Sequence, residues 1–321
     1  MTELYGYGDV YFEKFIKLDL KNLEKTIREL VDGHHIDLIH SQNAPDFLTV
    51  AAVHAVKDVP IVHDNQDAIS LRKTPYYLDA DMNKQLMDEQ TANECCDARV
   101  HVTEELKAYV EKKYGRKMDV VFYNYVSASL MPSSFKEKLS DKDGQVHIVY
   151  EGTLASLRGD HYDLKGIFKE IASHGMNIHI YDSHSNDDYL RLAETDDFIH
   201  YHGHLDPRDL LNEMTQYDFG WAGFNVAMNK PHMDVALPNK AFEYIACGLP
   251  ILSYPHKAQK KFIEKHGVGL VFEGIDEIPS MLTNTEVLRE IRKTVLKKRF
   301  EFTVERNIRK ITDFYSCVLE N

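Results

Sequence analysis

The sequence predicts an α/β protein of two domains, each built on a parallel sheet that helices cover on both faces. Short β-branched segments alternate with helical patterns, the alternation occurs in both halves, and a polar stretch, 133–145, separates the halves. The 321 residues, 43% of them hydrophobic, suffice for two ordinary cores. We expect an N-terminal domain over 1–135, a C-terminal domain over 146–302 and a closing helix over 303–321.

In the N-terminal half, helical patterns over 47–57 and 82–96 lie between the expected strands. A third helix follows the third strand, where Thr103 is placed as the N-cap and Glu104 and Glu105 complement the helix dipole. The expected strands are IDLIH (36–40), VPIVH (59–63), ARVHV (98–102) and DVVFY (119–123).

The C-terminal half repeats this pattern. Asp206 and Pro207 form an N-cap and first-position pair that opens a helix running to about Tyr217, and apolar residues at helical spacing predict a helix over 303–319. Ligands of such paired domains usually bind in the cleft, at the carboxyl ends of the strands. The expected strands are VHIVYEG (146–152), NIHIY (177–181), FIHYHG (198–203), DFGWAG (218–223), PILSY (250–254) and VGLVF (268–272).

The segment LPNKAFEYIACGLPILS, residues 237–253, contains one carboxylate, Glu243, in apolar surroundings. Pro238 suits the first position of a short helix that Gly248 ends, and a helical wheel places Asn239 and Glu243 on one strip beside the apolar face. Glu243 lies beyond the three residues that capping normally uses, although capping stays an alternative. The functional hypothesis is that this carboxylate accepts hydrogen bonds from a vicinal diol such as a ribose, while the helix N-terminus faces an anion.

Composition excludes several classes of function. A net charge of −13 disfavours a protein that grips nucleic acid phosphates. No apolar run is long enough to span a bilayer and the N-terminus does not resemble a signal peptide, so we expect a cytoplasmic protein. The basic runs 112–117 and 292–300 offer a peripheral contact with the inner membrane face as an alternative, although solvated helix ends explain them more simply.

Residues 237–253 resemble the donor-site segment of retaining nucleotide-sugar glycosyltransferases of the GT-B fold, in the large family-four-like group. The resemblance covers nearly the whole chain and implies two Rossmann-like domains facing across a cleft. Its C-terminal half is the more specific part. The other segments that agree in order and spacing are HIVYEGTL with DLKGI, FIHYHGHL with LLNEMTQYDFGWAGF, VGLVFE and, more loosely, DLIHSQN and PIVHDNQD.

The resemblance also implies roles for single residues. It makes Glu243 the ligand of the donor's ribose and Lys165 a cation facing the diphosphate, with Arg158 as a second candidate, because fixed cations stabilise the charge on a departing nucleoside diphosphate. Ordinary solvated charges are the alternative for both cations. Gly152 would let the backbone approach phosphate or sugar closely. The residues expected to shape the loop before the helix are Pro238, Asn239 and Lys240.

Two positions depart from the family pattern. Val235 stands where the family often has an acidic residue, eight positions before Glu243, and the adjacent Asp234 is a possible substitute. Gln66 stands at the family's histidine position on the acceptor side, followed by Asp67. Asp67 is the candidate to act near the sugar on this side, with His63 as an alternative, although a structural role is favoured for each.

The start of the chain departs further. The family opens with an apolar strand and a glycine-rich loop, and neither is visible before the helical pattern at 18–31. YGYGD, residues 5–9, contains glycines but follows no strand. Either the chain is a shortened piece, or the N-terminal domain is naturally reduced. A reduced domain could be completed by a partner subunit or by oligomerisation.

Three patterns are candidate metal sites. His200, His202 and His204 alternate along a strand, although a strand ending near a polar cleft is the favoured interpretation. DAD at 79–81 and DKD at 141–143 resemble the DxD motif of the other glycosyltransferase fold, but neither follows an apolar strand. We therefore expect no metal and no cofactor.

The sequence thus predicts a glycosyltransferase that moves a sugar from a nucleoside-diphosphate sugar to a hydroxyl of a glycan or lipid-linked acceptor, with retention. Its expected partners are that donor and acceptor, and no nucleic acid. A non-catalytic GT-B subunit with a nucleotide pocket is the main alternative, favoured by Gln66 and the missing opening strand. A sugar-nucleotide epimerase is a third hypothesis, but no extra acid and base pair supports it.

Overall fold

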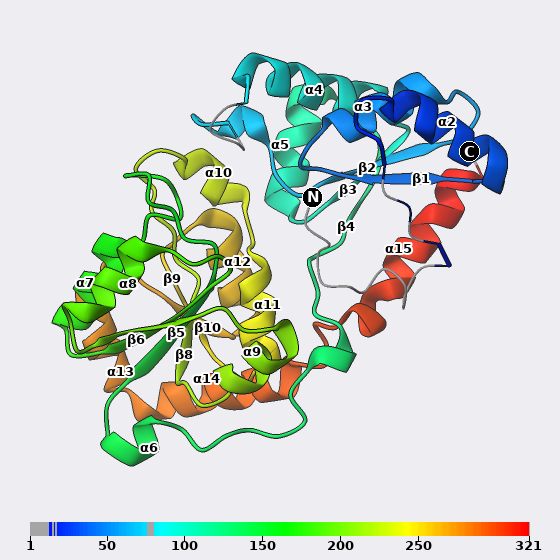
Figure 1. Cartoon of the computed structure of the whole chain (residues 1–321). Helices are drawn as coiled ribbons and strands as arrows, with labels where there is room; N and C mark the ends of the chain where they lie inside the picture. The colour runs from blue at the N-terminus through cyan, green and yellow to red at the C-terminus, as the bar shows by residue number, and fades with distance from the viewer. Residues whose placement is uncertain (1–12, 15, 17, 76–79, 321) are drawn as a thin grey trace.

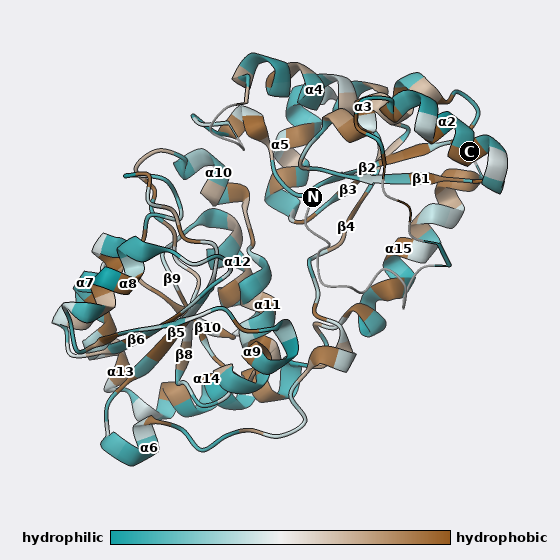
Figure 2. Cartoon of the chain, in the orientation of Figure 1, coloured by the Kyte–Doolittle hydropathy of each residue, from teal (hydrophilic) through white to brown (hydrophobic). Residues whose placement is uncertain are grey.

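The computed structural model describes residues 13–14, 16, 18–75 and 80–320, and it confirms two α/β domains, each with a parallel sheet (Figure 1). The glycine-containing segment 5–9 lies outside the described residues. Hydrophobic residues gather on the strands and on the helix faces turned toward them, as expected for sheets covered by amphipathic helices (Figure 2). Within the described part, no helix is both long and apolar enough to cross a membrane.

The N-terminal sheet has four parallel strands in the order β1-β2-β3-β4. Each strand pairs with the next one along the chain, and because such crossovers are right-handed, the connecting helices share one face of the sheet. The strands are β1 Ile39–Gln42, β2 Ile61–Asn65, β3 Ala98–His101 and β4 Met118–Val121. The helices are α2 Leu23–His34, α3 Phe47–Ala55, η1 Ile69–Leu71, α4 Met82–Cys95 and α5 Glu104–Tyr114.

The opposite face of this sheet is covered by the C-terminal helix α15, Val304–Leu319, which leaves the C-terminal domain and crosses back (Figure 1). Its N-cap Thr303 accepts a hydrogen bond from the Arg306 N–H. The buried cluster that joins α15 to the sheet consists of Val62, Ala98, Val100, Ile311, Phe314 and Val318.

The C-terminal sheet has six parallel strands in the order β10-β9-β8-β5-β6-β7. The chain proceeds outward from β5 in one direction and then returns to β8 and proceeds in the other, so the strand order reverses between β5 and β8. In open α/β sheets, ligands bind in the crevice at such a switch point. The strands are β5 His147–Gly152, β6 Asn177–Asp182, β7 Ile199–Gly203, β8 Phe219–Trp221, β9 Ile251–Ser253 and β10 Gly269–Val271.

Helices pack on both faces of this sheet, around two buried clusters. The first contains side chains of α9, α11, α12 and α14, and the second contains side chains of α7, α8 and α13. The helices are η2 Ala128–Leu130, α6 Ser140–Asp143, α7 Lys165–Ser173, α8 Asp187–Glu194, α9 Pro207–Met214, α10 Lys230–Val235, α11 Asn239–Ala246, α12 Lys257–His266, η3 Ile275–Glu277, α13 Ile278–Leu282 and α14 Thr285–Lys298.

The expected strands occur in both domains, and two helix boundaries differ from expectation. Pro238 has extended backbone, with ψ of 150°, so it is the N-cap of α11 and the helix begins one residue later. Helix α9 ends at Met214 rather than near Tyr217. Gly248 follows α11 with φ of +74°, the left-handed conformation that a helix-ending glycine adopts readily.

The domains are joined by two chain crossings and a docked helix. Val126, after β4, pairs with Thr303 in a parallel bridge, so both crossings run side by side. Helix α10 lies between these two crossings in the sequence. Its Val235 packs against the N-terminal domain, and the Val235 carbonyl accepts a hydrogen bond of 2.7 Å from the Thr103 hydroxyl. The expected linker, 133–145, runs along the C-terminal domain, where Leu139 packs against the core.

Candidate functional site

A cavity of about 880 Å³ lies between the two domains, and the switch point of the C-terminal sheet opens into it. Its size falls within the range of small-molecule sites. The residues that line it on the N-terminal side include Gln66, Asp67, Arg72 and Asn124. Those on the C-terminal side include Glu151, Gly152, Thr153, Asp182, His204, Leu205, Pro238, Asn239, Lys240 and Glu243.

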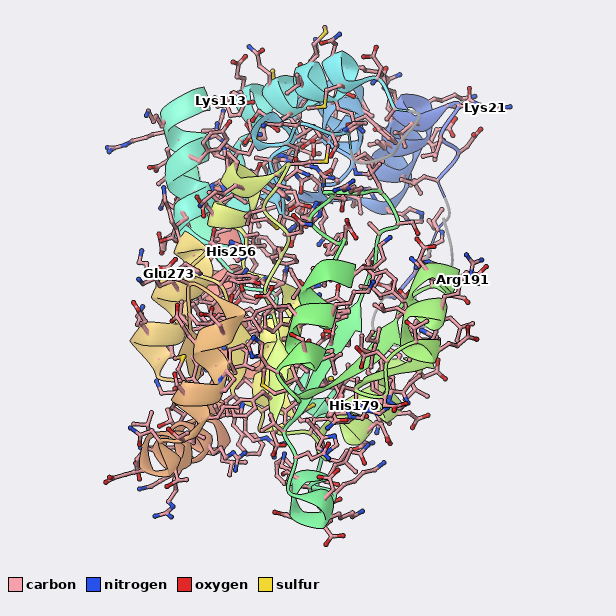
Figure 3. The ribbon with its side chains drawn as sticks, turned by 90° about the vertical axis from the view of Figure 1, so that its left-hand side faces the viewer. Lys21, Lys113, His179, Arg191, His256 and Glu273 are labelled. Atoms are coloured by element: carbon pink, nitrogen blue, oxygen red, sulfur yellow. The ribbon has the colours of Figure 1, made fainter. Side chains whose placement is uncertain are left out.

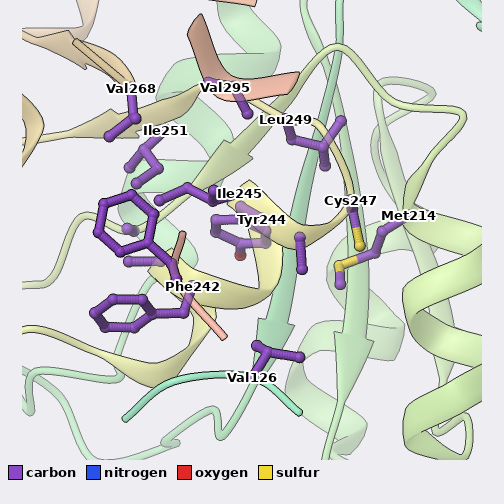
Figure 4. Close-up of a cluster of buried hydrophobic side chains, with 14 of the residues drawn as sticks. Val126, Met214, Phe242, Tyr244, Ile245, Cys247, Leu249, Ile251, Val268 and Val295 are labelled. Atoms are coloured by element: carbon purple, nitrogen blue, oxygen red, sulfur yellow. The ribbon is translucent and has the colours of Figure 1, made fainter. Parts of the chain in front are cut away.

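Helix α11 presents its first turn to this cavity. Phe242 and Ile245 point into the apolar core with Tyr244 (Figure 4), so Asn239 and Glu243 are left on the cavity side. No side chain caps the start of the helix, because the N-cap is a proline. The backbone N–H groups of the first turn and the helix dipole therefore face the cavity, as in sites that bind anions.

Lys240 is the buried cation of this site, with 7% of its surface exposed. Its ammonium lies 4.8 Å from the centre of the Tyr150 ring, a cation–π contact. It also lies beside Gly152, where an added Cβ would be 3.0 Å from the Lys240 Nζ. Gly152 has φ of +115°, which other residues rarely adopt, so this glycine makes room for the lysine at the end of β5.

Glu151, which precedes Gly152 at the end of β5, lines the same cavity as Glu243. Burial raises the pKa of Glu243 well above its usual range, the charge and hydrogen bond of Glu151 raise it further, and Lys240 opposes the shift. Sequence analysis missed Glu151. The available signal was an acidic residue placed directly before the glycine that ends an apolar strand.

Lys165 and Arg158 lie elsewhere. Both line a neighbouring pocket of about 910 Å³ on the C-terminal domain, and neither lines the cavity that contains Glu243. The Lys165 ammonium pairs with Asp188 at 3.0 Å and with Asp163 at 3.8 Å. The structure therefore brings Lys240, rather than these two cations, together with Glu243.

On the N-terminal side, Asp67 faces the cavity and pairs with His232 of α10 at 3.2 Å. Burial alone would raise the pKa of Asp67, but the charges of His232 and Arg72 and the hydrogen bond from His232 bring it below its usual value. Gln66 also lines the cavity and accepts a hydrogen bond of 2.8 Å from Asn124. Asp67 and Gln66 thus line, from the N-terminal domain, the same cavity as Glu243.

Three other residues weighed in the sequence do not line the cavity. His63 is fully buried and contacts Thr49 and Asp46. Asp234 is paired with Lys230 at 3.0 Å. Val235 contacts the N-terminal domain through its side chain and its carbonyl.

The histidines at the edge of the C-terminal sheet pack against one another. His202 hydrogen-bonds His179 (labelled in Figure 3) at 2.9 Å, His179 hydrogen-bonds His147 at 2.9 Å, and the His200 ring stacks on His179. No group of three or more potential ligands within the described residues is arranged to hold a metal ion. His204 instead lines the cavity.

The remaining acidic patterns belong to helix ends. Asp81 caps α4 by accepting from the N–H groups of Asn83 and Lys84, and residue 79 lies outside the described part of the chain. Asp143 lies at the end of α6 and hydrogen-bonds His147.

Residues 162–303 match the family model described as glucosyltransferase 3-like, C-terminal domain. No curated protein matches the chain. Sucrose-phosphate synthase from Thermosynechococcus elongatus has a similar structure, with a TM-score of 0.70 at 12% identity over 95% of this chain and 81% of that one. HepE of Anabaena in complex with UDP-glucose has a TM-score of 0.67 at 15% identity, over 92% of this chain and 82% of that one.

The GtfA/B complex is also similar, with a TM-score of 0.64 at 12% identity, over 93% of this chain and 61% of that one. At these identities the solved structures establish the fold. They agree with the resemblance that the sequence motifs indicated. The chain is thus a protein of the GT-B glycosyltransferase fold, and residues 162–303 of its C-terminal domain match the model of the glucosyltransferase 3-like C-terminal domain.

Proposed function

We propose that this protein transfers a sugar, with retention, from a nucleoside-diphosphate sugar to a hydroxyl of a glycan or lipid-linked acceptor. One observation carries the proposal: Glu243, Lys240 and the uncapped start of α11 converge at the switch point of the sheet, in a cavity that both domains line. This set of groups offers an acceptor for a diol beside donors for a diphosphate.

In this scheme Glu243 accepts hydrogen bonds from the ribose, and Lys240 and the first N–H groups of α11 bind the diphosphate. When the bond between the sugar carbon and the diphosphate oxygen breaks, these groups stabilise the charge on the leaving group. The acceptor oxygen bonds to the same sugar carbon, and its proton passes to the departing phosphate on the same face. Asp67, on the opposite wall, is proposed to contact the transferred sugar or the acceptor.

Lys165 and Arg158 receive no donor contact in this proposal, because both line the neighbouring pocket. They remain candidates for contacts outside the donor site.

Nucleotide binding is the first test. UDP, GDP, CDP and ADP are added separately in a thermal-shift assay, because a ligand that binds only the folded state raises its stability. The HepE complex makes UDP and UDP-glucose the first compounds to try. We expect one of the four diphosphates to raise the melting temperature. Sugar transfer is then tested with the sugar conjugates of that diphosphate, and NMR gives the anomeric configuration of the product. No shift with any of the four would contradict the proposal.

A non-catalytic GT-B subunit is the second candidate. Gln66, at the family's histidine position, and the missing opening strand favour it, and the GtfA/B complex shows that such a fold occurs in an assembly. A chain that binds a nucleotide but neither hydrolyses nor transfers from its sugar conjugate would support this candidate. Light scattering would then show whether the chain associates with itself, and co-purification would test for a partner subunit.

A further inference from the structure

Four polar side chains form a continuous chain of hydrogen bonds from the N-terminal sheet to the first residue of α11. The Gln66 amide nitrogen donates to the Asp64 carboxylate at 2.9 Å. The Asn124 amide nitrogen donates twice, to the Gln66 oxygen at 2.8 Å and to the Asn239 oxygen at 2.7 Å. Gln66, Asn124 and Asn239 all line the cavity between the domains. The N-terminal wall of the cavity is thus bonded through side chains to the start of α11.

The direction of these hydrogen bonds is set at Asp64. This residue of β2 is buried, and its other carboxylate oxygen pairs with the ring of His40 on β1 at 3.1 Å. A carboxylate offers acceptors only, so Gln66 must turn its amide nitrogen to Asp64 and its oxygen to Asn124. Asn124 must then present its nitrogen, which also faces Asn239, so Asn239 must present its oxygen. One carboxylate therefore fixes the orientation of three amides.

The amide nitrogen of Asn239 is left on the side away from Asn124. Within the described part of the chain, this nitrogen donates to no other atom. Asn239 is exposed, lies next to Lys240 and precedes Glu243 by about one turn, and all three residues line the cavity. Its side chain thus adds two N–H groups to the ammonium and the uncapped backbone N–H groups at the start of the helix.

We propose that Asn239 binds the diphosphate of the donor through its amide nitrogen, and that Asn124 is the positioning residue that turns this nitrogen toward the diphosphate. The inference rests on the proposed donor site and adds to it a contact whose orientation is decided in the other domain. A phosphate oxygen only accepts hydrogen bonds, so it attracts an amide that presents its nitrogen and repels one that presents its oxygen. The diphosphate therefore binds most tightly while Asn124 stays bonded to Asn239.

Asn124→Asp reverses the last hydrogen bond of this chain. An aspartate has no N–H to offer, so Asn239 can bond to it only by turning its nitrogen to residue 124 and its oxygen to the donor site. The added negative charge also repels the diphosphate, but it does so whether or not residue 239 is an amide. A double-mutant cycle of Asn124→Asp and Asn239→Ala therefore separates the effect of orientation from that of charge.

The experiment measures the Kd of UDP by calorimetry for the wild type, Asn239→Ala, Asn124→Asp and the double variant. GDP, CDP or ADP replaces UDP if the thermal-shift assay selects it. We expect Asn239→Ala to weaken binding at least about tenfold in the wild type, the scale for losing a hydrogen bond to a charged group, and less than about threefold in Asn124→Asp. The matched control is Asn212→Ala on the exposed side of α9, which should leave the Kd within about twofold.

Two results would overturn the proposal. A threefold or smaller loss of affinity in folded Asn239→Ala would exclude the contact with the diphosphate. Equal losses from Asn239→Ala in the wild type and in Asn124→Asp would exclude the orienting role of Asn124. Circular dichroism and melting temperatures establish that each variant is folded, and Asn239→Ala tests the contact even if Asn124→Asp does not fold. If no diphosphate binds the wild type, the donor site itself fails, whereas binding that Asn239→Ala leaves unchanged refutes this inference alone.

Discussion

Lys240 and Lys165 provide a direct comparison of two lysines near the donor domain. Replacing each by methionine keeps the length of an apolar stem and removes one charge. Lys240 is 7% exposed and lies in the cavity with Glu243, whereas Lys165 lies in the neighbouring pocket and is paired with Asp188. We expect Lys240→Met to impair transfer and Lys165→Met to leave it within about threefold of the wild type, since a partly exposed ion pair contributes roughly 0–1 kcal/mol.

The magnitude for Lys240 follows from its surroundings. Two unit charges about 4 Å apart interact by about 4 kcal/mol at an effective dielectric constant of about 20, the value suited to a partly buried site. Part of this attraction is present already in the bound donor, and only the part that grows as the phosphate leaves changes the rate. Removal of one such contact typically lowers kcat by a factor of about 100–1000. We therefore expect a loss of at least about 100-fold in kcat/KM for Lys240→Met.

The assay is steady-state transfer, or donor hydrolysis where the acceptor is unknown, with the nucleotide identified by thermal shift. Far-UV circular dichroism and the melting temperature of each variant establish that it is folded. A loss of kcat/KM of tenfold or less in folded Lys240→Met would refute the assignment of Lys240 as the cation. A loss in Lys165→Met larger than that in Lys240→Met would also refute it, and would restore the role that the family resemblance implied for Lys165.

Two further predictions concern stability. Phe314→Ala should destabilise the chain by about 3–5 kcal/mol in urea unfolding, because Phe314 is 7% exposed between α15 and the N-terminal sheet. The control Leu319→Ala, at a residue 51% exposed on the same helix, should change stability by about 0.5 kcal/mol or less. Similar losses of stability in the two variants would contradict the packing argument. Burial first, and then the positive charges of His200, His202 and His147, lower the pKa of His179 to about 2. In the unfolded chain this histidine binds a proton near pH 6.5, whereas in the folded chain His179 stays neutral, so the free energy of unfolding falls below that pH by up to about 1.4 kcal/mol per pH unit. His179→Gln should therefore make the free energy of unfolding less dependent on pH between about pH 6.5 and 4.5. An unchanged pH slope would contradict this prediction.

The strands were predictable from the sequence because each is a short apolar segment between turn and helix signals. The cap of α5 at Thr103 and the stop of α11 at Gly248 follow from local chemistry, and both occur in the structure. The strip shared by Asn239 and Glu243 follows from helical periodicity alone, and both residues line the cavity.

The details of the site depended on contacts between distant parts of the chain. Glu151 is a strand residue and Glu243 belongs to a helix much later in the sequence, so no local pattern predicts that both line one cavity. The direction of Lys165 is decided by Asp188 on another helix. The burial of Lys240 depends on the absent side chain of Gly152 and on the ring of Tyr150. Periodicity gives the face of an element, but the neighbour across that face decides the charge state and orientation of a side chain.

The return of α15 to the N-terminal domain has a mechanical consequence. The outgoing chain at Val126 and the returning chain at Thr303 are paired, and the Val304 N–H donates to the Val126 carbonyl at 3.0 Å. The two domains are thus joined by two chain segments that are bonded to each other rather than by one free linker. Val126, Thr303 and Val304 do not line the cavity, so a substitution at this pairing would change the connection between the domains without changing a lining residue.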